Sequence, residues 1–357
     1  MSAQVVVTLD TGTLALHDAQ LDYYGKRAAA ACGAQVQPTD SGLPEGDFTV
    51  YVWDITDGQQ RLTAQLKGHE GPVWKVAWAH PKFGSLLASC GYDMKVIIWK
   101  EVGTQWQKAF VDGSHSASVN DVAFCPWEHG CRVACASSDG TVSVLTYVAA
   151  EARWARTTFQ AHACGAQSVS WMPAVPRDNH GPVMRLATGG CDNSVCIWKC
   201  EDEVWTQEMP ALLPAHTDWV RQVAWRPDGT STVASGSWDK TVVIWKQEMD
   251  GQPWRQMAKI AAPGKVEGVA WSVTGSILVV SSDEGETVLY REAHDGRFEE
   301  IGKCGEAGYT EVPKPGAGIG SPAAVAFDAP PAQSPEPQAM SAEALKQQSV
   351  LDSFGMT

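Results

Sequence analysis

The chain has 357 residues, with 27 basic and 41 acidic side chains that give a formal net charge of −14. This length is enough for one large repeat fold or two ordinary domains with a sizeable core. The acidic balance argues against a nucleic-acid binder, which needs a basic surface for phosphates, and against electrostatic docking on anionic lipid. Solubility alone would also explain the acidity.

The beginning of the chain and its cysteines predict the compartment. The first residues, MSAQVVVTLDTG, lack the basic region and long apolar stretch of a signal peptide, and no apolar run approaches the roughly 20 residues of a membrane helix. Ten cysteines are present without a Cys-x-x-Cys pair, and Cys191, Cys196 and Cys200 have no second cluster near them. We therefore expect reduced thiols in strands, a cytosolic or nuclear location, and neither metal nor cofactor.

A β-branched run with a closing aromatic residue recurs along the chain. The endings read VYVWD, VIIWK, VSVLTY, VCIWK, VVIWK and TVLYR, and they close at Trp53, Trp99, Leu145, Trp198, Trp245 and Tyr290. The intervals between them are 45 to 53 residues, close to the ~40–45 residues of a four-stranded propeller blade. The chain therefore repeats one structural unit six times, with a leucine in place of the aromatic residue in the third unit.

The units read as groups of strands. Alternating residues such as Trp74, Val76 and Trp78 indicate strands with one packed face, and Pro227-Asp228-Gly229 is typical of a turn. A fourth strand follows each closing residue, at 61–66, Trp106, Trp154, Trp205, Trp254 and Phe298. We predict an all-β, six-bladed propeller over residues 1–302, with blades near 11–66, 67–111, 112–159, 160–209, 210–260 and 261–302.

A set of four residues recurs at fixed spacing inside three units. Asp precedes the closing Trp by six residues, and Ser or Thr precedes Asp by four. The sets are His69, Ser89, Asp93 and Trp99; His162, Thr188, Asp192 and Trp198; and His216, Ser235, Asp239 and Trp245. A hydrolase needs one Ser-His-Asp site, whereas repetition in register with the strands indicates a structural hydrogen-bond relay. We therefore expect no catalytic residue and no enzyme.

The other units carry incomplete sets. The third unit has His115 and Asp139, but Cys135 and Leu145 occupy the remaining places. The sixth unit has Asp283 without a preceding Gly-His pair. These losses predict that the relay has decayed in both units.

The first unit departs in a different way. It keeps His17, Asp47 and Trp53, but the segment Gly33–Gly46 is long and polar. Such a segment is typical of a mobile loop outside the sheet.

The repeat resembles the WD-repeat β-propellers, and Trp53-Asp54 is its one literal Trp-Asp ending. Longer phrases, including LHDAQLDYYGKR, GHEGPVWKVAWAHPKFGSLLASCGYDMKVIIWK and AHTDWVRQVAW, are similar to the Sec-thirteen family of small propellers. This similarity extends over about residues 5–302, and it departs at the first-unit loop, the sixth ending and the tail.

The resemblance implies a non-enzymatic scaffold, an open six-bladed propeller that a partner completes by inserting a seventh blade in trans. The implied partners are α-solenoid proteins. One is the large outer-coat subunit of coat protein complex II, at endoplasmic reticulum exit sites and on coated vesicles bound for the Golgi. Another is a scaffold nucleoporin of the nuclear pore's Y-shaped complex, and a nutrient-sensing assembly at the lysosome or vacuole is a third.

The strand count agrees with an open ring. Every unit has its own fourth strand, yet Val5, Val6, Val7, Thr8 and Leu9 form one more strand that belongs to no blade. An edge strand exposes unpaired N–H and C=O groups, which an inserted partner would pair by β-augmentation. The alternative is that Val5–Leu9 pairs with the first or the last blade and closes the ring in cis.

Two tryptophans are further candidates for partner binding. Trp74 and Trp219 stand at the starts of first strands, beside Lys75 and Arg221. Aromatic residues with a neighbouring arginine are typical of binding hot spots, which suggests a peptide-binding adaptor that uses the propeller's top face. The other interpretation, which we favour, is packing between blades.

The chain changes character after residue 302. Residues 303–357 are rich in Pro, Ala, Gly and Ser, as in PKPGAGIGSP and DAPPAQSPEP. This composition predicts a disordered tail.

Overall fold

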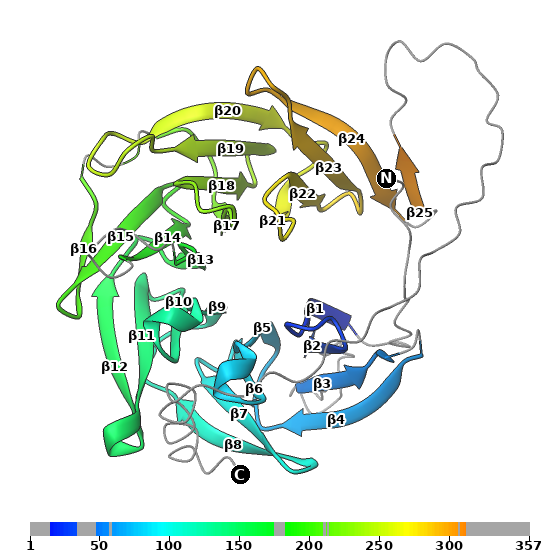
Figure 1. Ribbon diagram of the computed structural model, residues 1–357, viewed down its shortest axis with the longest axis vertical. Helices are drawn as coiled ribbons and strands as arrows, with labels where there is room; N and C mark the ends of the chain where they lie inside the picture. The colour runs from blue at the N-terminus through cyan, green and yellow to red at the C-terminus, as the bar shows by residue number, and fades with distance from the viewer. Residues whose placement is uncertain are drawn as a thin grey trace, which may run out of the picture.

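The structure is a computed structural model that describes residues 15–33, 48–56, 59–174, 183–209, 212, 214–305 and 308–311. Six antiparallel sheets surround a common axis, and the first strand of each sheet lies nearest that axis (Figure 1). The sheets follow one another around the ring in chain order, so the first and the last become neighbours. The predicted six-bladed, all-β propeller is therefore confirmed.

The first three sheets contain four strands each. The first has β1 (Ala15–Leu21), β2 (Arg27–Gly33), β3 (Thr49–Asp54) and β4 (Arg61–Lys67). The second has β5 (Val73–Trp78), β6 (Leu86–Gly91), β7 (Val96–Val102) and β8 (Gln105–Asp112). The third has β9 (Val119–Phe124), β10 (Arg132–Ser137), β11 (Thr141–Val148) and β12 (Arg153–Gln160). Short 3-10 helices lie between strands: η2 (Pro81–Phe83), η3 (Trp127–His129) and η4 (Ala149–Glu151).

The last three sheets continue the pattern, and the sixth has an additional strand. The fourth sheet has β13 (Ala166–Trp171), β14 (Met184–Gly190), β15 (Val195–Glu201) and β16 (Val204–Gln207). The fifth has β17 (Val220–Trp225), β18 (Thr232–Ser237), β19 (Thr241–Lys246) and β20 (Arg255–Ala261). The sixth has β21 (Val266–Trp271), β22 (Ile277–Ser282), β23 (Thr287–Glu292), β24 (Phe298–Gly305) and β25 (Gly308–Glu311).

The sixth sheet corrects the predicted start of the tail. Strand β24 runs three residues past position 302, and β25 then pairs antiparallel with it, Gly305 opposite Gly308 and Gly302 opposite Glu311. The averaged composition after residue 302 concealed this hairpin, because its strand is short and the residues beyond it are rich in Pro and Gly. Residues 312–357 lie outside the described part of the chain.

Apolar clusters fill the spaces between consecutive sheets. Between the first and second sheets, for example, Val50 and Val52 pack with Val76 and Ile97, and Trp99 belongs to the same cluster. Comparable clusters join the second sheet to the third, the third to the fourth, the fourth to the fifth and the fifth to the sixth. Burying one such aliphatic side chain contributes about 1.5–3 kcal/mol, so these layers stabilise the ring. Among the described residues, no apolar cluster joins the sixth sheet to the first.

Each innermost strand contains a β-bulge at the same position. The register between the first and second strands skips one residue in every sheet, and the six skipped residues are His17, Trp74, Asn120, Gln167, Arg221 and Glu267. All six line one cavity of about 220 Å³ on the propeller axis. A bulge changes the direction in which a side chain points. Here the bulges direct polar and aromatic side chains into the central channel.

Candidate functional site

The second blade contains a complete relay. The Asp93 carboxylate only accepts hydrogen bonds, so His69 donates from Nδ1 to it, at 3.0 Å to each oxygen. Nε2 of His69 then accepts from the Ser89 hydroxyl at 2.8 Å, and the Trp99 Nε1–H donates to the same hydroxyl oxygen at 2.8 Å. Asp93 also accepts the backbone N–H of Glu70 at 3.0 Å, which fixes the loop before β5.

The fourth and fifth blades repeat this geometry. His162 contacts Asp192 at 2.9 Å and Thr188 at 2.8 Å, and Trp198 donates to Thr188 at 3.0 Å. In the fifth blade the corresponding distances are 3.1 Å from His216 to Asp239, 2.8 Å from His216 to Ser235 and 2.9 Å from Trp245 to Ser235. The structure therefore brings together all twelve residues of the three predicted sets.

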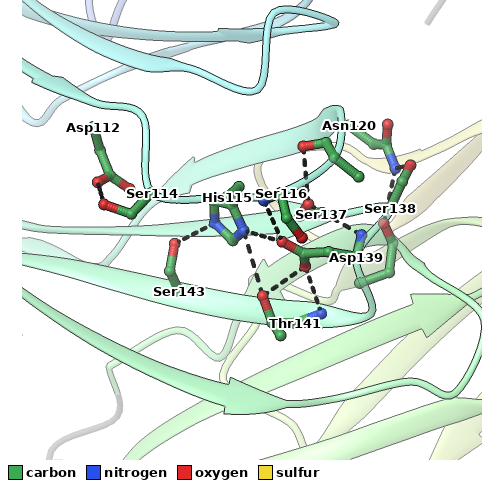
Figure 2. A network of polar contacts seen from close by, with 12 residues as sticks. Asp112, Ser114, His115, Ser116, Asn120, Ser137, Ser138, Asp139, Thr141 and Ser143 are labelled. Atoms are coloured by element: carbon green, nitrogen blue, oxygen red, sulfur yellow. Dashed lines mark hydrogen bonds and ion pairs between the residues drawn. The ribbon is translucent and has the colours of Figure 1, made fainter.

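The third blade corrects the prediction that its relay has decayed. His115 still contacts Asp139, at 2.9 Å from Nδ1, and its Nε2 accepts a hydrogen bond from the hydroxyl of Ser143 at 2.8 Å (Figure 2). Ser143 lies on β11, directly opposite Cys135 on β10. The hydroxyl has moved to the neighbouring strand, which a spacing rule along one strand cannot detect. Only the tryptophan donor is absent, because Leu145 takes its place.

In the described residues, neither the sixth blade nor the first blade forms the relay. Asp283 accepts the backbone N–H of Lys265 at 2.8 Å, so it keeps the loop contact without a histidine. His17 occupies the bulge position of β1 and packs edge to face on Trp74, with ring centroids 4.6 Å apart. Ala30 stands where Ser89 stands in the second blade, so the first blade has no hydroxyl there. Asp47 lies outside the described residues.

The electrostatics of the relays agree with a structural role. Burial opposes ionisation of Asp139 and Asp192, but hydrogen bonds from Thr141 to Asp139 and from His162 to Asp192 outweigh it and hold both pKa values well below the usual range. The pKa of Asp93 and of Asp239 is lowered in the same way. Burial lowers the pKa of His216, which favours the neutral ring. Each carboxylate therefore stays ionised and accepts hydrogen bonds from the histidine and from a backbone N–H of the loop.

The two candidate tryptophans have different surroundings. Trp74 lines the axial cavity, and its Nε1–H donates to Ser118 Oγ of the next blade at 2.8 Å, so it packs between blades. Trp219 is 40% exposed and stacks on Trp238 with ring centroids 5.0 Å apart. Trp238 in turn donates to Glu267 at 3.0 Å. The pair forms an aromatic surface on the fifth blade, next to Glu267 of the sixth blade.

The innermost strand of the first blade has an uncovered face. In the other five blades, the position before the bulge is fully buried against the preceding blade; these residues are Val73, Val119, Ala166, Val220 and Val266, all 0% exposed. In β1 the same position is Leu16, which is 38% exposed. Ala19 is exposed as well, and Leu21, at the position that Trp78 occupies in β5, is 59% exposed.

The opposing face of the sixth blade is also incompletely covered. Val279 and Leu289 pair across β22 and β23, in the register of Ala88 and Ile98 of the second blade. Ala88 and Ile98 are 0% exposed because the third blade covers them, whereas Val279 and Leu289 are only partly buried. Sequence reasoning missed both faces, since apolar residues in strand register read the same whether or not a neighbour covers them. The predicted strand of Val5, Val6, Val7, Thr8 and Leu9 lies outside the described residues.

The cysteines and the other potential metal ligands are the remaining candidates for a chemical site. All ten cysteines are free thiols, and burial raises the pKa of Cys125 to about 12 and that of Cys196 to about 11. In the part of the chain that the structure describes, no three or more potential metal ligands come together. No helix within the same residues is long and apolar enough to cross a membrane.

The fold, the repeat and the relays define a WD-repeat β-propeller. The sequence model for the WD domain, G-beta repeat matches residues 60–100, 107–144, 154–199 and 208–246. The chain belongs, within this class, to the Sec13 family. It is 40% identical over 304 residues to "Protein transport protein sec13" of Aspergillus clavatus, covering 80% of this chain and 98% of that protein. It is 42% identical over 299 residues to "Protein transport protein SEC13" of Yarrowia lipolytica, covering 80% and 95%, and 39% identical over 297 residues to "Protein SEC13 homolog" of Drosophila melanogaster, covering 79% of each chain.

Proposed function

We propose that this protein is a non-enzymatic scaffold subunit for protein transport, whose propeller is open between the sixth and first blades. An α-solenoid partner inserts a blade into that junction. In the outer cage of coat protein complex II the partner is the large coat subunit, and in the nuclear pore scaffold it is a nucleoporin. The protein therefore works at endoplasmic reticulum exit sites, on coated vesicles and at nuclear pores, where it stiffens the partner.

The observation that carries this proposal is the uncovered face of β1. Leu16 is 38% exposed and Leu21 is 59% exposed, although the equivalent face is packed in every other blade. Partly buried Val279 and Leu289 border the junction from the other side. Apolar residues that are exposed or only partly buried on two neighbouring faces are typical of an interface that a partner covers.

The energetics favour a whole blade over a single strand. Covering one exposed leucine contributes about 1.5–3 kcal/mol, and each new backbone hydrogen bond contributes a net ~1 kcal/mol. Association costs at least about 4 kcal/mol in lost translational and rotational freedom, before any side chain is ordered. One added strand would leave little net affinity, whereas an inserted blade would cover both faces of the junction and form a large, permanent interface.

The relatives support the transport role. Those of Aspergillus clavatus and Yarrowia lipolytica are named as protein transport proteins, and the similarity spans at least 95% of each. A scaffold also agrees with the relays of the second to fifth blades, whose polar groups are satisfied within their own blade. A nutrient-sensing assembly at the lysosome or vacuole belongs to the same proposal as a third site of action.

The test is affinity purification of the full chain from its own cells, with mass spectrometry of the proteins that co-purify. We expect α-solenoid subunits of the vesicle coat, the nuclear pore or both, in near-stoichiometric amounts. Co-expression with the recovered partner should raise the melting temperature, because ligation of the folded state stabilises it. Recovery of a robust, unaccompanied monomer whose melting temperature no partner changes would refute the proposal.

The second candidate function is a peptide-binding adaptor that uses the top face. The exposed Trp219, stacked on Trp238, favours it, because exposed tryptophans are common at binding hot spots. A peptide bound there would be lost on replacing Trp219, whereas an inserted blade would depend on Leu16 and Leu21. The two functions therefore require different surfaces and can be separated by mutation.

A further inference from the structure

A repeated hydrogen bond links most innermost strands to the innermost strand of the next blade, and we call this series a ladder. The residue after the bulge offers a side-chain oxygen, and this oxygen accepts a backbone N–H from the following blade. The donors and acceptors are Val76 N–H to Asp18 Oδ2 at 3.2 Å, Val169 N–H to Asp121 Oδ2 at 3.0 Å, Val223 N–H to Ser168 Oγ at 3.2 Å and Val269 N–H to Gln222 Oε1 at 3.2 Å. Four of the five junctions within the chain therefore use the same contact.

The remaining junction, between the second and third blades, lacks this bond because of the residue at its acceptor position. Lys75 occupies the acceptor position of the second blade, and an ammonium group cannot accept a hydrogen bond. The N–H of Val122, which would have been its donor, instead donates to Oδ1 of its own neighbour Asp121 at 2.9 Å. Lys75 forms an ion pair with Asp18 at 3.2 Å. An N–H at this position is thus supplied with an acceptor even when the preceding blade has none.

The ladder ends at the junction between the sixth and first blades. Gly268 holds the acceptor position of the sixth blade and has no side chain to offer. A Cβ at Gly268 would come within 2.5 Å of Ser281 Oγ and 3.2 Å of Gln222 Oε1, so the neighbouring polar groups already fill that space. The sixth blade therefore provides no side-chain acceptor for the innermost strand that follows it.

On the other side of the junction, Ala19 holds the donor position. It has the register of Val76, opposite Ala30 as Val76 is opposite Ser89, so its N–H points away from β2. Within the described residues, no hydrogen bond to that N–H is present, and the Ala19 side chain is exposed. An N–H that becomes buried without an acceptor weakens binding by about 5- to 100-fold.

We propose that the partner's innermost strand carries an aspartate, asparagine, glutamine, serine or threonine whose side-chain oxygen accepts the N–H of Ala19. This inference rests on the proposed function, since it describes the blade that fills the junction. The partner repeats the chemistry of Asp18, Asp121, Ser168 and Gln222. The partner supplies the side-chain oxygen that Gly268 cannot supply. The bond forms only between the partner and the first blade, because the sixth blade offers no side-chain acceptor to the partner.

The test compares two substitutions at one position in the full chain. Ala19→Pro removes the N–H at an edge where proline is tolerated, whereas Ala19→Val keeps the N–H and installs the side chain found at the four equivalent donor positions. We expect Ala19→Pro to weaken capture of the partner recovered by affinity purification by about 5- to 100-fold, with an unchanged melting temperature of the free protein. Ala19→Val should capture the partner at least as well as the wild type.

Hydrogen exchange of the wild-type chain gives a second measurement that needs no folded proline variant. The Ala19 amide should exchange fast in the free protein and slowly in the complex. Replacing the facing polar residue of the partner by alanine should restore fast exchange. Equal capture by wild type and Ala19→Pro, or fast exchange in the complex, would overturn the inference while the proposed function stands. Failure of the wild type to capture any α-solenoid would instead refute the proposed function.

Discussion

The hydroxyl of Ser143 lies directly across the strand pair from Cys135, and it donates to His115 Nε2 at 2.8 Å. In three other blades the hydroxyl sits on the second strand, at Ser89, Thr188 and Ser235. The histidine ring is therefore satisfied in the third blade from the neighbouring strand. The position of the hydroxyl in space is preserved although its position in the sequence has changed.

This relationship predicts a rescue. Ser143→Ala should lower the free energy of unfolding by about 1–3 kcal/mol, because it leaves the buried His115 Nε2 without a donor. The double variant Cys135→Ser with Ser143→Ala should recover most of that loss, since it returns the hydroxyl to the second strand. Urea denaturation of both variants measures the effect. A silent Ser143→Ala, or a double variant no more stable than the single one, would contradict the assignment.

The pKa values predict a loss of stability in two pH ranges. Burial lowers the folded-state pKa of His216, so its contribution is present above about pH 6.5 and is lost as the pH falls through its folded pKa. Hydrogen bonding outweighs burial and lowers the pKa of Asp93, Asp139, Asp192 and Asp239, so their contribution is lost only below about pH 4. The urea midpoint of His216→Gln should vary less than that of the wild type between pH 7 and pH 5. Parallel curves for the two proteins would show that His216 does not titrate as described.

The uncovered face of β1 predicts a variant that separates binding from folding. Leu21→Asp should leave the melting temperature of the free protein nearly unchanged, because Leu21 is 59% exposed. It should weaken capture of the partner by at least about tenfold, because a charge would be buried without a counterion. Val204→Asp is the matched control, since Val204 is 60% exposed on the outer part of the fourth blade. Equal capture by both variants would place the interface elsewhere.

The aromatic pair on the fifth blade, Trp219 and Trp238, should not contribute to capture of an α-solenoid, in contrast to Leu21. Trp219→Ala removes a 40% exposed ring, so we expect little change in stability and no change in capture of an α-solenoid. Affinity purification of Trp219→Ala beside Leu21→Asp measures both surfaces in one experiment. Loss of co-purifying proteins with Trp219→Ala alone would favour the peptide-binding adaptor.

The sequence by itself determined the repeat, the six blades and three of the relays. Each of these depends on contacts at fixed separations along the chain, such as the 10 residues from Ser89 to Trp99, and periodicity records such contacts directly. The sequence could also place a bulky apolar residue at Leu16 and at Leu21, in strand register.

Only the tertiary structure decided which apolar faces are covered and which polar groups are paired. The burial of Val73 and the exposure of Leu16 depend on a neighbouring blade, and that neighbour is set by ring geometry over many tens of residues. The same reason hid Ser143 and the ladder that ends at Gly268 and Ala19, because their partners meet across strands and across blades. Local spacing carries no record of these distant contacts, so the exposed face of β1 and the N–H of Ala19, unpaired among the described residues, emerged only from the fold.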